Sequence, residues 1–266
     1  MSEINDQDYL REKQYRDASN LNARIRLHAE FSTNKYGWFR WVFDQYELPT
    51  RASVLELGCG PGDLWLENIS RIPKGWQITL SDFSTGMLAQ VREKLSILAR
   101  PINFELIDAQ SIPYEDDQFD IVIANHFLYH VPDRSKALSE IRRVLKPGGQ
   151  FYATTIGVNH MKELPELVAR FDPENGAFLK SDEIPFNMEN GEAQIRIYFS
   201  EVEERRYQDD LRVRDVEVLA DYIYSGMRLG LDANQRDDLT AFLHREMAAN
   251  GGLIKIQKDS GMFIAQ

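Results

Sequence analysis

Apolar residues follow two alternating rhythms along the middle of the chain. Between residues 53 and 156, short apolar runs typical of strands alternate with longer segments whose apolar residues recur at helical spacing. The predicted strands are SVLELG, WQITLSD, INFELID, FDIVIAN and QFYATTI, and the predicted helices are DLWLENISRI, STGMLAQVREKLSILA and SKALSEIRRVL. Such alternation predicts right-handed crossovers and a parallel α/β sheet. The segment DIVIAN is apolar on both faces, as expected of a strand covered on both sides.

The pattern differs on either side of this region. Residues 6–30 predict a mostly polar helix, and residues 32–48 predict a helix whose aromatic side chains are typical of packing on a sheet. After residue 156 the alternation stops. HMKELPELVARF, DVEVLADYIYSGM and ANQRDDLTAFLHREMAAN have a helical pattern, AQIRIYFSEVEERRYQD contains strand-like stretches, and LIKIQKDSGMFIAQ predicts a closing hairpin or strand.

Composition narrows the class of protein. The 266 residues are 43% hydrophobic, enough for a sizeable core, and the net charge of −11 argues against nucleic acid as the main partner. The one cysteine excludes an internal disulfide and a CxxC metal site, and we expect no bound metal. The polar start and the lack of a long apolar run predict a soluble cytoplasmic protein that does not bind membranes.

The segment GCGPG follows the first predicted strand and leads into a helix. Its glycines, Gly58, Gly60 and Gly62, can adopt positive φ and let a ligand approach the backbone, while the helix N-terminus offers unpaired N–H groups. Asp82 and Asp108 end the next two predicted strands. Each could simply cap a helix or turn, but acids at successive strand ends favour a nucleoside site. The spacing differs from the GxGxxG of dinucleotide-binding proteins.

Four motifs extend this pattern: LELGCGPG, LSDFSTGML, LIDAQSIPYEDDQFDIVIANHFLYHVPD and IRRVLKPGGQFYATTI. As a set they resemble the class I S-adenosylmethionine-dependent methyltransferases, most closely the small-molecule, type 11-like branch. The resemblance covers roughly residues 50–156. It implies S-adenosyl-L-methionine as cofactor, with S-adenosyl-L-homocysteine as product. A nicotinamide-dependent dehydrogenase is a further alternative, which the loop spacing disfavours.

The resemblance assigns roles to ten residues. The glycines of the loop would pass the methionine and ribose parts of the cofactor, Glu56 would reach the methionine amino group, and Asn125 would lie near the methionine end. The remaining contacts would come from Asp82 at the ribose hydroxyls, Phe83 and Met87 against the adenine, and Asp108 and Ala109 at the adenine amino group. Cys59 in the same loop is interpreted as a packing residue.

The resemblance also implies a fold and a division of the chain. The fold is a Rossmann-like, doubly wound, seven-stranded sheet whose last strand runs antiparallel, and LIKIQKDSGMFIAQ is consistent with that strand. The predicted segments are an N-terminal helical cap (1–49), a cofactor-binding core (50–156), an insertion or lid after the fifth strand (157–200), and C-terminal strands and helices that complete the core sheet (201–266).

Candidate catalytic residues lie in NHFLYHVPD. His126 directly follows the fourth predicted strand, where the resemblance places the transferable methyl group, and a histidine can accept a proton near neutral pH. Tyr129 follows at helical spacing; packing roles compete for both residues, and His130 more closely fits a loop-holding role. Candidate substrate contacts are Tyr15 in the cap, and Tyr222 and Tyr224 in DYIYSGM, for which solvation or packing is the alternative.

The sequence thus predicts methyl transfer to an oxygen, nitrogen or carbon atom of a small-molecule metabolite. Two alternatives stay open: a methyltransferase acting on RNA or protein, and a cofactor-binding protein that does not methylate. The acidic balance disfavours RNA. The acceptor, the need for a general base and the oligomeric state are not encoded in any motif, because fold does not fix function.

Overall fold

A computed structural model describes residues 19–97, 100–173, 183–226 and 233–266. Its main sheet has seven strands. Their order from one edge to the other is β3 (Ile102–Leu106), β2 (Gly75–Asp82), β1 (Arg51–Leu57), β4 (Phe119–Asn125), β5 (Leu145–Ile156), β9 (Ser260–Ala265) and β6 (Val202–Tyr207). The first five strands pair in parallel, and β9 runs antiparallel to both of its neighbours. The predicted fold class, including the antiparallel last strand, is confirmed.

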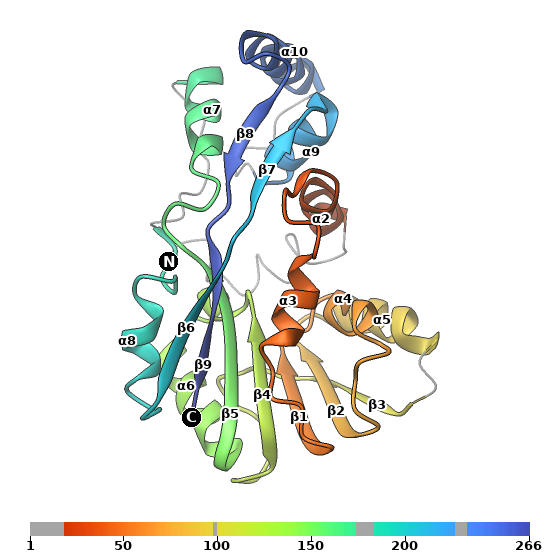
Figure 1. The fold of residues 1–266 in the computed structure, drawn as a ribbon, viewed down its shortest axis with the longest axis vertical. Helices are drawn as coiled ribbons and strands as arrows, with labels where there is room; N and C mark the ends of the chain where they lie inside the picture. The colour runs from red at the N-terminus through yellow and green to blue at the C-terminus, as the bar shows by residue number, and fades with distance from the viewer. Residues whose placement is uncertain (1–18, 98–99, 174–182, 227–232) are drawn as a thin grey trace.

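Helices cover both faces of this sheet (Figure 1). One face carries α3 (Trp38–Asp44), α4 (Asp63–Glu67) and α5 (Thr85–Lys94) with η3 (Leu95–Ile97); the other carries α6 (Arg134–Val144) and α8 (Gly191–Ile195). Successive strand residues face opposite ways, so that Val54 packs with the first group of helices and Leu55 with the second. The continuous apolar strands of the sequence therefore reflect a sheet buried on both sides.

A second layer of structure, here called the second body, lies beyond the edge at which the parallel strands end (Figure 1). It is a two-stranded sheet of β7 (Asp210–Val213) and β8 (Ile254–Gln257) packed with α2 (Ser19–Phe31), α7 (Glu163–Phe171), α9 (Val216–Gly226) and α10 (Ala233–Ala249). Its apolar core includes Leu27, Leu164, Leu219 and Leu243, all fully buried. Segments from the predicted cap, insertion and C-terminal region thus share one core.

One antiparallel ribbon connects the two bodies. Strand β6 leads directly into β7, and β8 leads directly into β9, with Tyr207 opposite Ser260 on one side of the break and Asp210 opposite Gln257 on the other. We call residues 207–210 and 257–260 the joint. The segment LIKIQKDSGMFIAQ therefore forms two strands that pair with different partners; the predicted antiparallel C-terminal strand is confirmed, and the alternative of a closing hairpin is wrong.

One local prediction fails for a physical reason. The strand-like stretch that begins AQIRIYF opens as helix α8, and the strand starts only at Val202. Ile195 and Phe199 lie four residues apart and are both buried in the same apolar cluster against the sheet. Residues four apart share a face in both a helix and a strand, but Ile197, which a strand would place on that same face, is 74% exposed, so the turn is helical. Across the described ranges, the helices are too short or too polar to span a bilayer.

Candidate functional site

The glycine loop adopts the predicted left-handed backbone. The φ angles of Gly58, Gly60 and Gly62 are +68°, +52° and +79°. A Cβ added to Gly58 would lie 2.5 Å from the ring of Phe127, and one added to Gly62 would lie 2.5 Å from Val91. A Cβ on Gly60 would meet no atom of the described residues within 4 Å. Protein packing therefore accounts for two of the glycines, while the space over Gly60 is open to a ligand.

Asp82 lies at the end of β2 and reaches back to this loop. Its carboxylate accepts hydrogen bonds from the backbone N–H groups of Gly60, at 3.0 Å, and of Ser84, at 2.8 Å. Burial raises the pKa of Asp82, and its bonds to backbone N–H groups oppose that rise. Ser84 in turn caps α5 by accepting from the Met87 N–H. The carboxylate thus connects the glycine loop to the start of α5.

A chain of polar contacts crosses three strand ends. Glu56 of β1 accepts from Trp65 Nε1 at 2.5 Å and from Asn125 Nδ2 at 2.9 Å. Thr154 of β5 donates to Asn125 Oδ1 at 3.2 Å, and its own backbone oxygen accepts from the His126 N–H at 3.1 Å. Two of the predicted residues, Glu56 and Asn125, are thereby in direct contact. The contributions of Trp65 and Thr154 have no signal in the sequence.

Glu56 is a buried carboxylate with a strongly raised pKa at this edge of the sheet. It is 2% exposed, and burial raises its pKa to about 7, against the opposing hydrogen bonds from Trp65 and Asn125. The carboxylate of Asp82 adds a smaller rise in the pKa. A buried carboxylate of this kind is stabilised by an approaching cation. The site therefore favours a ligand with an ammonium group.

The residues expected around adenine lie at the ends of β2 and β3. Met87 and Ala109 are buried, and Phe83 is half-buried. The Asp108 carboxylate accepts from the backbone N–H of Gln110 at 2.9 Å and from its side-chain amide at 3.0 Å. Asp108 thus forms a turn at the strand end while lying on the same edge of the sheet as Asp82.

His126 stands at the end of β4 in a strained backbone conformation. Its φ is +47°, a region that residues other than glycine rarely adopt. Burial lowers its pKa to about 4, and the positive charges of Lys258 and His130 lower it further. The imidazole is therefore neutral at physiological pH, and so low a pKa makes it a weak base. The ring of Tyr129 lies 6.4 Å from that of His126.

Aromatic rings from outside the core segment cover His126. The ring of Trp38, in α3, lies 5.2 Å from that of His126, and the ring of Tyr207, in β6, lies 5.3 Å from that of Trp38. Trp41 completes the group, 5.3 Å from each of the other two aromatic rings. We call Trp38, Trp41 and Tyr207 the aromatic roof. Sequence reasoning expected Trp38 and Trp41 only to pack a helix, and missed Tyr207.

The candidate substrate residues lie in different places. Tyr222 of α9 is half-buried in the second body, with its hydroxyl 3.2 Å from Met161 Sδ and its ring 5.9 Å from that of His28. Tyr224 is 40% exposed and lies under the guanidinium of Arg236. Tyr15 lies outside the described residues. The described residues therefore do not bring the three tyrosines together at one place.

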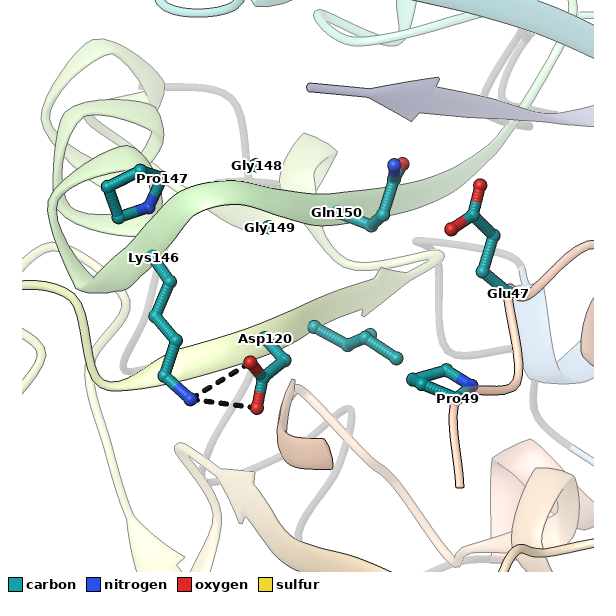
Figure 2. A pocket seen from close by; sticks show the side chains of 9 residues that line it. Glu47, Pro49, Asp120, Lys146, Pro147, Gly148, Gly149 and Gln150 are labelled. Carbon is teal, nitrogen blue, oxygen red and sulfur yellow. Dashed lines mark hydrogen bonds and ion pairs between the residues drawn. The ribbon is translucent and has the colours of Figure 1, made fainter. Parts of the chain in front are cut away.

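A separate surface pocket lies at the opposite end of the sheet (Figure 2). It is lined by Glu47, Pro49, Asp120, Ile121 and residues 146–150, near the start of β1, β4 and β5. Lys146 forms an ion pair with Asp120 beside it. In open α/β sheets ligands bind at the carboxyl ends of the strands, so this pocket is not the candidate site. The described ranges hold no cluster of metal-ligating side chains.

Part of the chain matches a known family of protein domains. Residues 55–153 match a family model described as a methyltransferase domain. A ubiquinone/menaquinone biosynthesis C-methyltransferase UbiE from Geotalea daltonii is 35% identical over 115 residues, which are 42% of this chain and 49% of that protein. The chain thus spans about half the length of the curated relatives it matches.

Two solved structures share the fold. A phosphoethanolamine N-methyltransferase 2 from Haemonchus contortus, in complex with S-adenosyl-L-methionine, has a TM-score of 0.61 at 22% identity, covering 97% of this chain and 59% of that one. The [4+2]-cyclase SpnF has a TM-score of 0.53 at 18% identity, covering 86% and 79%. Residues 55–153 of the chain thus match a methyltransferase domain, and the fold of the chain is similar to that of a solved N-methyltransferase.

Proposed function

We propose that the protein is an S-adenosylmethionine-dependent methyltransferase that acts on an oxygen, nitrogen or carbon atom of a small-molecule metabolite. The observation that carries the proposal is the buried carboxylate of Glu56, which lies on the same strand-end edge as the open face of Gly60 and the carboxylate of Asp82. The ammonium group of the cofactor would match the Glu56 carboxylate, its sulfonium the open face of Gly60, and its ribose the Asp82 carboxylate. The relatives' names support the reaction, and the acidic chain supports a small-molecule acceptor over nucleic acid.

The residues fit S-adenosylmethionine. Glu56 would hold the amino group, Asp82 the ribose hydroxyls, and the loop at Gly60 the part of the ligand that passes closest to the backbone. When bound, the cofactor supplies an electrophilic methyl group on a sulfonium ion. The remaining tasks fall to the chain, which must orient the acceptor and exclude water. The aromatic roof would exclude water above His126, and the neutral His126 ring would orient the acceptor by accepting a hydrogen bond from it.

Two further observations concern the nucleophile and the acceptor. The lone cysteine, Cys59, is buried, and burial raises the pKa of its thiol well above the usual value, so it is a packing residue rather than a nucleophile. The relatives' names point to quinone precursors as one acceptor class to test first. We extend to this chain only the coarser statement of a small organic acceptor, because the match covers about half of those proteins.

Calorimetry tests the cofactor and a coupled assay tests the reaction. S-adenosylmethionine and S-adenosylhomocysteine should both bind, and Asp82→Ala should weaken both by at least about tenfold because a charge-assisted contact is lost. Asp116→Ala, at an exposed loop acid, should leave binding unchanged. Release of S-adenosylhomocysteine is then measured over phenols, hydroquinones and amines. Absence of binding to the wild type would refute the proposal, and binding without transfer would favour a non-methylating protein, since a cyclase shares the fold.

A further inference from the structure

The joint between the two bodies contains a buried ion pair. Lys258 Nζ lies 2.6 Å from Asp209 Oδ2, and the two side chains are only 7% and 1% exposed. The Asp209 carboxylate also accepts from the Ser32 hydroxyl at 2.8 Å, the Thr33 hydroxyl at 3.1 Å and the Asn34 N–H at 2.9 Å. One carboxylate therefore fastens the segment between α2 and α3 to the point where the ribbon passes from one body to the other.

The same ammonium begins a chain of ring contacts that ends at the strand edge. Lys258 Nζ lies 5.7 Å from the centroid of the Tyr207 ring, within cation–π range. Tyr207 lies 5.3 Å from Trp38, which lies 5.2 Å from His126. The segment held by Asp209 leads directly into α3, which carries Trp38. A continuous series of packed side chains thus connects Lys258 in the joint to His126.

We propose that Lys258 is a positioning residue for methyl transfer, which, clamped by Asp209, holds His126 in place through Tyr207 and Trp38. This inference rests on the proposed function and names no new reactant. Its physical basis is the cost of burying charge, because a joint that only needed stability would be served as well by apolar side chains. In this proposal, the charge of Lys258 affects both the electrostatic potential at His126 and the position of the His126 ring.

Electrostatics connect the same groups. The positive charge of Lys258 lowers the pKa of His126 and also that of His160, although burial is the larger cause for both. Among the described residues, the other titratable groups near His126 are Tyr129 and His130 of η4 (Leu128–His130) and His160 from the segment before α7. Tyr207 of β6 lies one ring further away, against Trp38. Removing the ammonium should therefore make His126 easier to protonate without changing the cofactor site.

Histidine-labelled protein, studied by NMR with and without S-adenosylhomocysteine, tests this. In Lys258→Met the titration midpoint of His126 should rise by about one pH unit, with affinity for S-adenosylhomocysteine within about threefold of the wild type. Lys258→Arg keeps the cation and should restore a near-wild-type midpoint. Lys255→Met, at an exposed lysine of β8, is the matched control and should change neither quantity. An unchanged His126 midpoint in folded Lys258→Met would overturn the proposal.

A second variant covers the case in which Lys258→Met does not fold. Tyr207→Leu removes the ring between Lys258 and Trp38, so the chemical shifts of the His126 ring should change as Trp38 loses its support; unchanged shifts would overturn the proposal. Failure of the proposed function is distinguishable, because it appears as a wild type that binds no S-adenosylhomocysteine. Failure of this inference appears as a wild type that binds S-adenosylhomocysteine normally, while the His126 midpoint and chemical shifts do not change in the joint variants.

Discussion

The two bodies of the molecule are built in different ways from the same chain. Strands β1 to β5 and the helices between them come from one continuous stretch, residues 51–156. The second body collects three separate stretches, the first containing α2, the second α7, and the third β7, α9, α10 and β8. The first is therefore specified by neighbours in sequence, and the second by contacts between distant segments. Function follows the same division, since the candidate cofactor residues lie in the first body.

The second body nevertheless bears on the site through the joint and the roof. Two of the roof residues, Trp38 and Trp41, come from the segment that follows α2, and Tyr207 is the last residue of β6 and the first of the joint. The cofactor contacts and the cover over His126 thus have separate structural origins. We expect substitutions in the two bodies to have separable effects, and the following predictions test that separation.

The largest expected effect is on stability. Leu219 in α9 and Leu55 in β1 are both fully buried leucines, one in each body. Each change to alanine should lower the free energy of unfolding by about 2–5 kcal/mol, measured by urea denaturation, because both leave a cavity. Only Leu55→Ala, next to Glu56 in β1, should also weaken S-adenosylhomocysteine binding. If Leu219→Ala weakens binding equally under native conditions, the two bodies are one energetic unit and the comparison breaks.

A smaller effect concerns Glu56 and pH. Burial raises its pKa to about 7 in the folded protein, above the unfolded value, so the ligand-free protein should lose stability as pH rises from about 4.5 through 7. The ionised form that appears above pH 7 should bind the cofactor's ammonium. Affinity for S-adenosylmethionine should therefore increase between pH 6 and pH 8.

Glu56→Gln should remove both trends. The amide still offers an oxygen to the Trp65 N–H but cannot ionise, so cofactor affinity should become independent of pH and about tenfold weaker at pH 8. Adenosine lacks the ammonium group and provides the control, since calorimetry should show the same adenosine affinity for both proteins at both pH values. A pH-independent affinity in the wild type would contradict the role given to Glu56.

The contrast between the bodies also explains what the sequence could predict. Positive φ at Gly58, Gly60 and Gly62, and the reach of Asp82 to the loop, follow from local motifs and from parallel strands ending at one edge. The contact between Trp38 and His126 joins residues that are far apart in the chain, and no local pattern marks it.

The two predictions that were wrong in part, the closing hairpin and the start of the AQIRIYF strand, have the same origin. Alternating apolar residues in LIKIQKDSGMFIAQ correctly indicate strands, but the change of partner at Lys258 depends on Asp209, far away in the sequence. Likewise, the spacing of Ile195 and Phe199 is compatible with a strand in the sequence. Their helical turn follows from packing against the main sheet, which the local sequence does not show. Tertiary contacts decide both cases.

The smallest expected effect separates backbone strain from ligand approach. Gly60 and Gly251 both have positive φ, +52° and +70°, and a Cβ on either would meet nothing within 4 Å. Changing either to alanine should destabilise the protein by about 1 kcal/mol, because an L-residue is strained in this conformation. Gly251 lies in the turn after α10, in the second body.

Only one of the two variants should affect the cofactor. In Gly60→Ala the new methyl group projects into the open space over the glycine loop, so S-adenosylmethionine should bind about fivefold more weakly, roughly 1 kcal/mol. In Gly251→Ala the affinity should match the wild type despite equal strain, as measured by calorimetry at one temperature and pH. Equal affinities in the two variants would mean that the space over Gly60 is not where the ligand passes, and that positive φ alone explains the glycine there.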